Sequence, residues 1–321
     1  MLASENIPQE TVNPQVDNRR GLIFDIDRYA IHDGPGIRLL IFMKGCALRC
    51  LWCCNPESQN FFPELAYFPA KCIGCGACIE LCPEKATQMN EGKLVVDWKL
   101  CKSCGKCIER CFTDARKLFG RLLSIEEVFQ EVKKNIIFFK NSGGGVTVGG
   151  GEVTGQPDFV RDLLKRCREE QLHTAIETCG YCSWEILKKI LKFTDLVYYD
   201  IKHMDPQKHK RLTGVLNEGI LKNLIRVSHK PVDLIVRVPL IPDYNDDEGN
   251  LRSTAEFIMR ELNLSRFKRV ELLPYHKWGA FKYERLGRTY SFKSLEAPDN
   301  EKMESSRKMI ESYGLPCQVG G

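Results

Sequence analysis

The 321-residue sequence contains no run of about 18 apolar residues, so it predicts no transmembrane helix. The first twenty residues lack the apolar core of a secretory signal, and we expect residues 1–20 to form a disordered tail. The net charge of +5 comes without a basic block or interleaved aromatic residues, which argues against a nucleic-acid partner. P-loop and dinucleotide-binding glycine motifs are also absent, as is a Ser/His/Asp triad motif. These absences predict a cytoplasmic protein with neither a membrane nor a nucleic acid as its partner.

Cysteine, by contrast, is abundant, with 16 residues. A secreted disulfide scaffold would be shorter and would carry a signal, so these cysteines point to metal binding. Most of them fall into three tight groups, at residues 46–53, 72–82 and 101–111. We assign no metal-binding role to the remaining five, which are Cys54, Cys167, Cys179, Cys182 and Cys317.

Three segments differ in pattern: residues 21–60 begin with extended apolar runs, residues 61–120 are cysteine-rich and aperiodic, and residues 121–321 alternate between helices and strands. Short β-rich runs predict six strands, at 37–43, 145–149, 173–178, 195–201, 232–239 and 268–273. Helices are expected after a capping box at Ser124 and Glu127, after Pro157 and Ser183, and near 216–228, 248–262 and 300–313. Alternating βα units predict an α/β fold with a parallel sheet, either a partial barrel or a doubly wound sheet.

The first cysteine group lies directly after a predicted strand. Cys46, Cys50 and Cys53 have C-x3-C-x2-C spacing, which can hold three corners of a [4Fe–4S] cube. The fourth iron then has no protein ligand and can bind another molecule. The alternatives are a zinc site with a distant fourth ligand and plain buried cysteines.

This motif, with Trp52 before its third cysteine, resembles the signature of the radical S-adenosylmethionine (SAM) superfamily. The preceding HDGPGIR (32–38) and the following NPES (55–58) resemble the glycyl-radical-enzyme activating enzymes within it. The resemblance covers most of the chain and implies a partial (β/α)6 radical SAM barrel. It also implies reductive cleavage of SAM by the cluster, giving a 5′-deoxyadenosyl radical that installs a glycyl radical on a partner enzyme.

The second and third cysteine groups repeat one spacing, C-x2-C-x2-C-x3-C, typical of a ferredoxin-like domain with two [4Fe–4S] clusters. In that arrangement the fourth cysteine of each run binds the other cluster. We therefore predict one cluster on Cys72, Cys75, Cys78 and Cys111, and another on Cys101, Cys104, Cys107 and Cys82. Phe112 stands where the pattern expects proline, which weakens the pairing, and zinc knuckles are the alternative.

The resemblance also implies a SAM site, built from motifs that each follow a predicted strand. Gly150, Gly151 and Glu152 would hold the SAM amino group, Arg237 and His276 would contact SAM, and the backbone of Cys54 would line the adenosine pocket beside Trp52. Glu177, Thr178 and Asp200 would form a monovalent cation site near SAM, although this chain has Glu177 where aspartate is expected.

Asp200 and Lys202 are two apart on an extended segment and should face the same side. Lys202 could bind the SAM methionine carboxylate, with Ile201 and His203 beside it; an ordinary surface salt bridge is the alternative. Asp33, in HDGPG, is the candidate contact for the partner, or an ordinary turn residue.

Among activating enzymes, the two-cluster insert indicates those of glycyl radical decarboxylases, dehydratases, C–N or C–S lyases, or hydrocarbon–fumarate adding enzymes. The insert would relay electrons from flavodoxin or ferredoxin, or serve as a docking or structural module. Three alternatives remain: another radical SAM protein modifier such as a sulfatase-maturing enzyme, a simple electron carrier, and a zinc-binding interaction protein.

Overall fold

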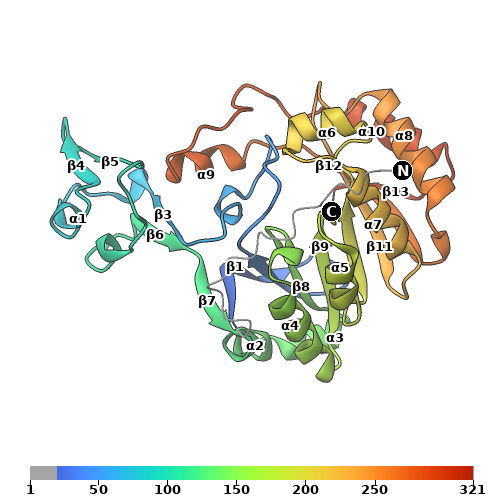
Figure 1. Ribbon diagram of the computed structural model, residues 1–321, viewed down its shortest axis with the longest axis horizontal. Coiled ribbons are helices and arrows are strands. Elements are labelled where there is room, and N and C mark those ends of the chain that lie inside the picture. The colour runs from blue at the N-terminus through green and yellow to red at the C-terminus, as the bar shows by residue number, and fades with distance from the viewer. Residues whose placement is uncertain (1–19, 321) are drawn as a thin grey trace, which may run out of the picture.

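The computed structural model describes residues 20–320, and its main feature is a nine-stranded mixed sheet (Figure 1). All six predicted strands are confirmed and lie side by side in parallel: β2 (Arg38–Met43), β8 (Gly145–Gly150), β9 (His173–Thr178), β10 (Leu196–Asp200), β11 (Asp233–Leu240) and β12 (Phe267–Pro274). One edge adds the parallel strand β13 (Cys317–Val319). The other adds β1 (Arg20–Ala30), antiparallel to β2, and then β7 (Arg121–Ser124), antiparallel to β1. The predicted tail, except Arg20, lies outside the described residues.

The order of the strands separates the two predicted architectures. From β2 through β8 to β13 the order never reverses, whereas a doubly wound sheet needs a reversal at its switch point. The sheet winds in one direction and ends in β7 and β13, which do not pair with each other within residues 20–320. The chain therefore forms an open, singly wound α/β sheet, and the doubly wound alternative is wrong.

Helices follow the strands, and most of them pack on one face of the sheet. They are α2 (Ile125–Lys133), α3 (Ile136–Ser142), α4 (Pro157–Glu169), α5 (Trp184–Leu191), α6 (Pro206–Thr213), α7 (Glu218–Ser228), α8 (Glu248–Glu261) and α10 (Asn300–Glu311). The predicted capping box is confirmed, because the Ser124 side chain accepts from the Glu127 amide at 3.2 Å and Glu127 accepts from the Ser124 amide at 2.7 Å. The sequence prediction missed α6 and a further helix, α9 (Gly279–Arg285).

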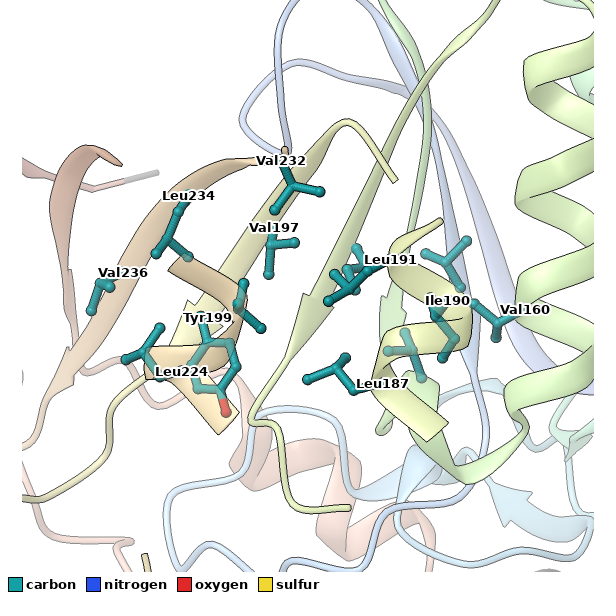
Figure 2. Close-up of a cluster of buried hydrophobic side chains, with 14 of the residues drawn as sticks. Val160, Leu187, Ile190, Leu191, Val197, Tyr199, Leu224, Val232, Leu234 and Val236 are labelled. Carbon is teal, nitrogen blue, oxygen red and sulfur yellow. The ribbon is translucent and has the colours of Figure 1, made fainter. Parts of the chain in front are cut away.

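Side chains along β10 alternate between the two faces of the sheet. Val197 and Tyr199 are buried against α5 and α7, among apolar side chains that interlock beneath those helices (Figure 2). The Tyr199 hydroxyl donates to the Ile220 carbonyl oxygen at 2.7 Å. Each fully buried large apolar side chain stabilises the fold by about 1.5–3 kcal/mol. Tyr198, between them, faces the opposite side, and that inner face carries the polar residues described below.

The segment between β2 and β7 leaves the sheet and forms a small body at the left of Figure 1. It contains two antiparallel strand pairs, β3 (Glu64–Tyr67) with β6 (Arg116–Phe119) and β4 (Thr87–Asn90) with β5 (Lys93–Val96), and the short helix α1 (Ala77–Glu80). Leu65, Leu94 and Val96 form its core together with the buried Cys78 and Cys107. Helix α9 lies between this body and the sheet. No helix among residues 20–320 is long and apolar enough to cross a membrane.

Candidate functional site

A single cavity of about 280 Å³ opens at the carboxyl ends of the parallel strands. It brings together most of the predicted site residues: Cys46, Cys50, Trp52, Cys53, Cys54, Gly150, Gly151, Glu152, Glu177, Thr178, Asp200, Lys202, Arg237 and His276. These residues come from segments up to 230 positions apart in the chain. Their convergence follows from the topology, because parallel strands place all their carboxyl ends at one edge.

The loop with the first cysteine group is held in place from several sides. The amides of Gly45 and Cys46 donate to the carbonyl oxygens of Ser58 and Gln59, at 2.6 and 3.2 Å. The carboxyl end of α6 supplies two more acceptors, because the Arg49 amide donates to the Thr213 oxygen at 2.7 Å and the Leu51 amide to the Leu212 oxygen at 3.0 Å.

Helix α9 closes the remaining side of this loop. A Cβ added to Gly279 would lie 2.8 Å from the carbonyl oxygen of Cys53, so this position requires glycine. Lys282 donates to the Asn55 side chain at 2.8 Å and lies 3.4 Å from the Glu57 carboxylate. Helices α6 and α9, both missed by the sequence prediction, thus hold the cysteine loop.

The Glu152 carboxylate is fixed by hydrogen bonds within the cavity wall. One oxygen accepts from the Thr154 amide and hydroxyl and from the Thr178 hydroxyl, at 3.1, 2.9 and 2.6 Å. The other accepts from the Cys179 amide and thiol, at 2.8 and 3.0 Å. These five hydrogen bonds fix the position of both carboxylate oxygens. Cys179 was missed as a site residue, although its position directly after Thr178 at the end of β9 was a usable signal.

Lys202 and Asp200 face the same side, as predicted, and form an ion pair of 2.8 Å. Lys202 is not a surface residue, because its side chain is only 12% exposed. Burial is the largest single influence and lowers the pKa of Lys202, but the Asp200 carboxylate together with Cys50 and Cys179 raises it well above its ordinary value. The cavity wall therefore carries a fixed ammonium.

Arg237 bridges two carboxylates on the inner face of the sheet. Its guanidinium lies 2.5 Å from Glu177 and 2.8 Å from the fully buried Glu271, and it stacks over the Tyr198 ring with its carbon 3.7 Å from the ring centre. It also donates to the carbonyl oxygen of His32 at 3.2 Å. Arg237 thus links the cavity to the HDGPG loop.

Three residues that were predicted to lie near SAM or to contact the partner do not line the cavity. Ile201 is buried in the core on the outer face, and the His203 Nδ1 accepts from the amide of Asp205 at 2.9 Å. Asp33 lies in the HDGPG loop, where its carbonyl oxygen accepts from the Thr147 hydroxyl at 2.6 Å. Arg38 fixes the same loop by donating to the Pro35 carbonyl oxygen at 3.0 Å.

The donor set of the cavity suits an iron–sulfur cluster and a polar ligand. Burial raises the pKa of the Cys46, Cys50 and Cys53 thiols to about 12, so a metal group that binds them must displace their protons. The buried Nδ1 of His276 has no hydrogen-bond partner within the described chain and is available to a ligand. Within residues 20–320, no three Cys, His, Asp or Glu side chains converge on one point as the ligands of a single metal ion do.

The cysteine-rich segment contains two further cavities, and each holds one predicted set of four cysteines. A cavity of about 170 Å³ is lined by Cys72, Cys75, Cys78 and Cys111. A narrower one, of about 20 Å³, is lined by Cys82, Cys101, Cys104 and Cys107. In both, the fourth cysteine of one run joins the first three of the other. Phe112, which replaces the expected proline, is 90% exposed beside the first cavity.

Comparison with known proteins identifies relatives over nearly the full length. The sequence model of the radical SAM superfamily matches residues 40–255. The chain is 42% identical to the (2S)-3-sulfopropanediol dehydratase activating enzyme of Klebsiella oxytoca, covering 94% of this chain and 97% of that protein. It is 40% identical to the trans-4-hydroxy-L-proline dehydratase activating enzyme of Clostridioides difficile, covering 94% and 99%.

A third relative activates an enzyme of a different reaction class. The indoleacetate decarboxylase activating enzyme of Tractidigestivibacter scatoligenes is 38% identical, covering 94% of this chain and 97% of that protein. Such identity over such coverage excludes a simple electron carrier and a zinc-binding interaction protein. This chain belongs to the radical SAM superfamily and, within it, to the family of glycyl-radical-enzyme activating enzymes.

Proposed function

We propose that this chain activates a glycyl radical dehydratase, decarboxylase or lyase, with its chemistry in the 280 Å³ cavity. Cys46, Cys50 and Cys53 would hold the [4Fe–4S] cluster, which supplies, with bound SAM, one-electron cleavage and abstraction of a hydrogen atom from glycine. One observation carries the proposal: a single cavity joins three motif cysteines to an anchored carboxylate, Glu152, and a fixed ammonium, Lys202.

The charges on the cavity wall match the two ends of an amino acid. Glu152, anchored by its hydrogen bonds, would accept from the amino group of SAM beside Gly150 and Gly151. Lys202 would pair with the methionine carboxylate. Trp52 and Cys54 would line the adenosine pocket, and Arg237 and His276 would contact SAM. The residues that would hold a monovalent cation are Glu177, Thr178 and Asp200.

Residues 61–120 would form a ferredoxin-like insert with two auxiliary [4Fe–4S] clusters. The two cysteine-lined cavities support this assignment, because the crossed pairing of two-cluster ferredoxins predicts their linings. The insert would pass electrons from a flavodoxin or ferredoxin towards the SAM cluster. Its Trp98 packs against Gly287, just after α9, where an added Cβ would lie 2.1 Å from the indole ring.

The partner class follows from the relatives and from the insert. Named relatives activate dehydratases, lyases and decarboxylases at 37–42% identity, a range too narrow to favour one of these classes. The glycine-bearing loop of the partner would enter from the side of the HDGPG loop, which Arg38 and Thr147 fix. Asp33 would contact that loop.

The experiment combines the anaerobically reconstituted chain, SAM, a flavodoxin or dithionite, and candidate partners from the three classes. We expect a glycyl radical in the electron paramagnetic resonance (EPR) spectrum of one partner, and no radical when its loop glycine is changed to alanine. Cleavage of SAM without a radical on any partner of these classes would contradict the proposed partner class.

A further inference from the structure

Arg116 is a buried cation between the two sets of cysteines in the insert. It begins strand β6 and is only 2% exposed. One terminal nitrogen, Nη1, lies 4.0 Å from the Cys107 sulfur, which belongs to the second set. The same side chain lines the cavity of the first set, which contains Cys78. Arg116 therefore borders both cavities.

The other two nitrogens of this guanidinium have no partner. Nε and Nη2 of Arg116 are buried and make no hydrogen bond within the described chain. Other buried cations here are satisfied: Lys44 pairs with Glu64, and Arg38 donates to Thr147 and to backbone carbonyl oxygens. A buried charge with unpaired donors is costly, so such a group indicates an anionic ligand that completes the site.

The surroundings of Arg116 leave its charge directed at the cysteines. On one side its guanidinium lies over the Tyr67 ring, 5.1 Å from the ring centre, which fixes its position without neutralising it. Nη1 of Arg116 lies 4.0 Å from the Cys107 sulfur, and Arg116 lines the first cavity together with Cys78. One cation thus borders a cysteine of each set.

We propose that Arg116 is a positioning residue shared by the two auxiliary clusters, with one guanidinium that stabilises the reduced form of both. The proposal rests on the proposed function of the insert. Reduction of either cluster by one electron from the external donor adds one negative charge beside Arg116. A nearby cation, with hydrogen bonds to cluster sulfurs, favours that added charge and raises the reduction potential. Arg116 would therefore allow a donor of moderate reduction potential to reduce both clusters.

The test is an EPR-monitored redox titration of the holoenzyme and of Arg116→Gln, with iron counted in each sample. We expect a roughly tenfold or greater fall in the equilibrium constant for reduction of both auxiliary clusters, a downward shift of about 59 mV or more. Arg110→Gln is the matched control, because it removes the same charge from a side chain that is 58% exposed beside the first cavity. We expect its potentials, and that of the SAM cluster in both variants, to stay unchanged.

Two outcomes overturn the role of Arg116 while leaving the clusters in place: unchanged potentials in Arg116→Gln with full iron, or an equal shift in Arg110→Gln. If Arg116→Gln loses iron, Arg116→Lys replaces it. The ammonium keeps the charge but presents one nitrogen in place of three, so we expect at least one of the two potentials to fall, and two unchanged values overturn the proposal. A wild-type chain that binds only about four irons contradicts the auxiliary clusters themselves, and the role of Arg116 falls with them.

Discussion

The ammonium nitrogen of Lys202 lies 2.8 Å from the carboxylate of Asp200, in the wall of the cavity that also holds the three motif cysteines. Because Lys202 would also pair with the SAM carboxylate, we expect Lys202→Met to raise the Kd for SAM by about tenfold to a hundredfold. Anaerobic equilibrium dialysis measures this change. Lys192→Met, on an exposed side chain, is the control. An unchanged Kd would mean that Lys202 serves the ion pair alone.

A substitution at Asp33 can distinguish loss of partner contact from loss of SAM cleavage. Since its side chain lies outside the SAM cavity, Asp33→Asn should leave 5′-deoxyadenosine formation without partner within about twofold of wild type. Formation of the glycyl radical, counted by EPR, should fall about tenfold or more because a partner contact is lost. Asp27→Asn makes the same charge change at an exposed position of β1 and should leave both readouts intact. Equal losses in both readouts for Asp33→Asn would contradict a role in partner contact.

His209 makes the support of the cysteine loop sensitive to acid. It is buried in α6, and burial lowers its pKa from 6.5 to about 4, so the folded chain keeps it neutral. The unfolded chain takes up a proton below pH 6.5, so His209 lowers the free energy of unfolding as pH falls from 6.5 to 4, by about 3 kcal/mol in full. Above pH 6.5 this loss is absent.

We therefore expect chemical unfolding at pH 7 and pH 5 to show a smaller loss of stability in His209→Gln than in wild type. His229→Gln, which changes an exposed histidine, should keep the wild-type pH dependence. A pH dependence that His209→Gln leaves unchanged would show that other groups cause the acid sensitivity.

The crossed pairing of the insert cysteines has a simple signature in iron content. Cys72 and Cys111 line one cavity. Cys72→Ala, Cys111→Ala and the double variant should therefore each lose the same cluster of about four irons. Cys72→Ala combined with Cys82→Ala should cost about eight, because Cys82 lines the other cavity. Iron analysis with EPR spectra of the reduced variants measures this. Losses that group Cys72 with Cys82 would reverse the pairing.

The strands could be predicted because they depend on local sequence, and the convergence of the motifs because alternating helices and strands imply a parallel sheet. β-rich runs give the six parallel strands, and parallel strands place the residues that follow them at one edge. The same alternation that puts Asp200 and Lys202 in the cavity wall turns Ile201 to the opposite face. The prediction that Ile201 lies beside SAM did not take this alternation into account.

The helices that hold the cysteine loop gave weaker signals. Helix α6 buries only His209, Leu212 and Thr213, and α9 only Gly279 and Tyr283, so neither has the apolar stripe that predicts a helix. Asp205, whose side chain accepts from the Lys208 amide at 2.6 Å, was an available cap signal for α6.

The pairing of strands in the insert has no signature in the local sequence. Strands β3 and β6 pair Tyr67 with Arg116, residues about fifty positions apart, and no local periodicity reports such a partner. The burial of Arg116 between the two cysteine sets follows from that pairing and was therefore invisible in the sequence.

The central claim is that the chemistry lies at Cys46, Cys50 and Cys53, and one comparison tests it most directly. Anaerobic wild type, Cys46→Ala and Cys167→Ala are given SAM and dithionite, and 5′-deoxyadenosine is measured beside iron content. Cys167 is buried in α4 away from every cysteine group, so its variant controls for the loss of a thiol. We predict cleavage in wild type and Cys167→Ala, and none in Cys46→Ala, which should retain about eight irons in the insert. Cleavage by Cys46→Ala at the wild-type rate, or none by wild type, would contradict the account.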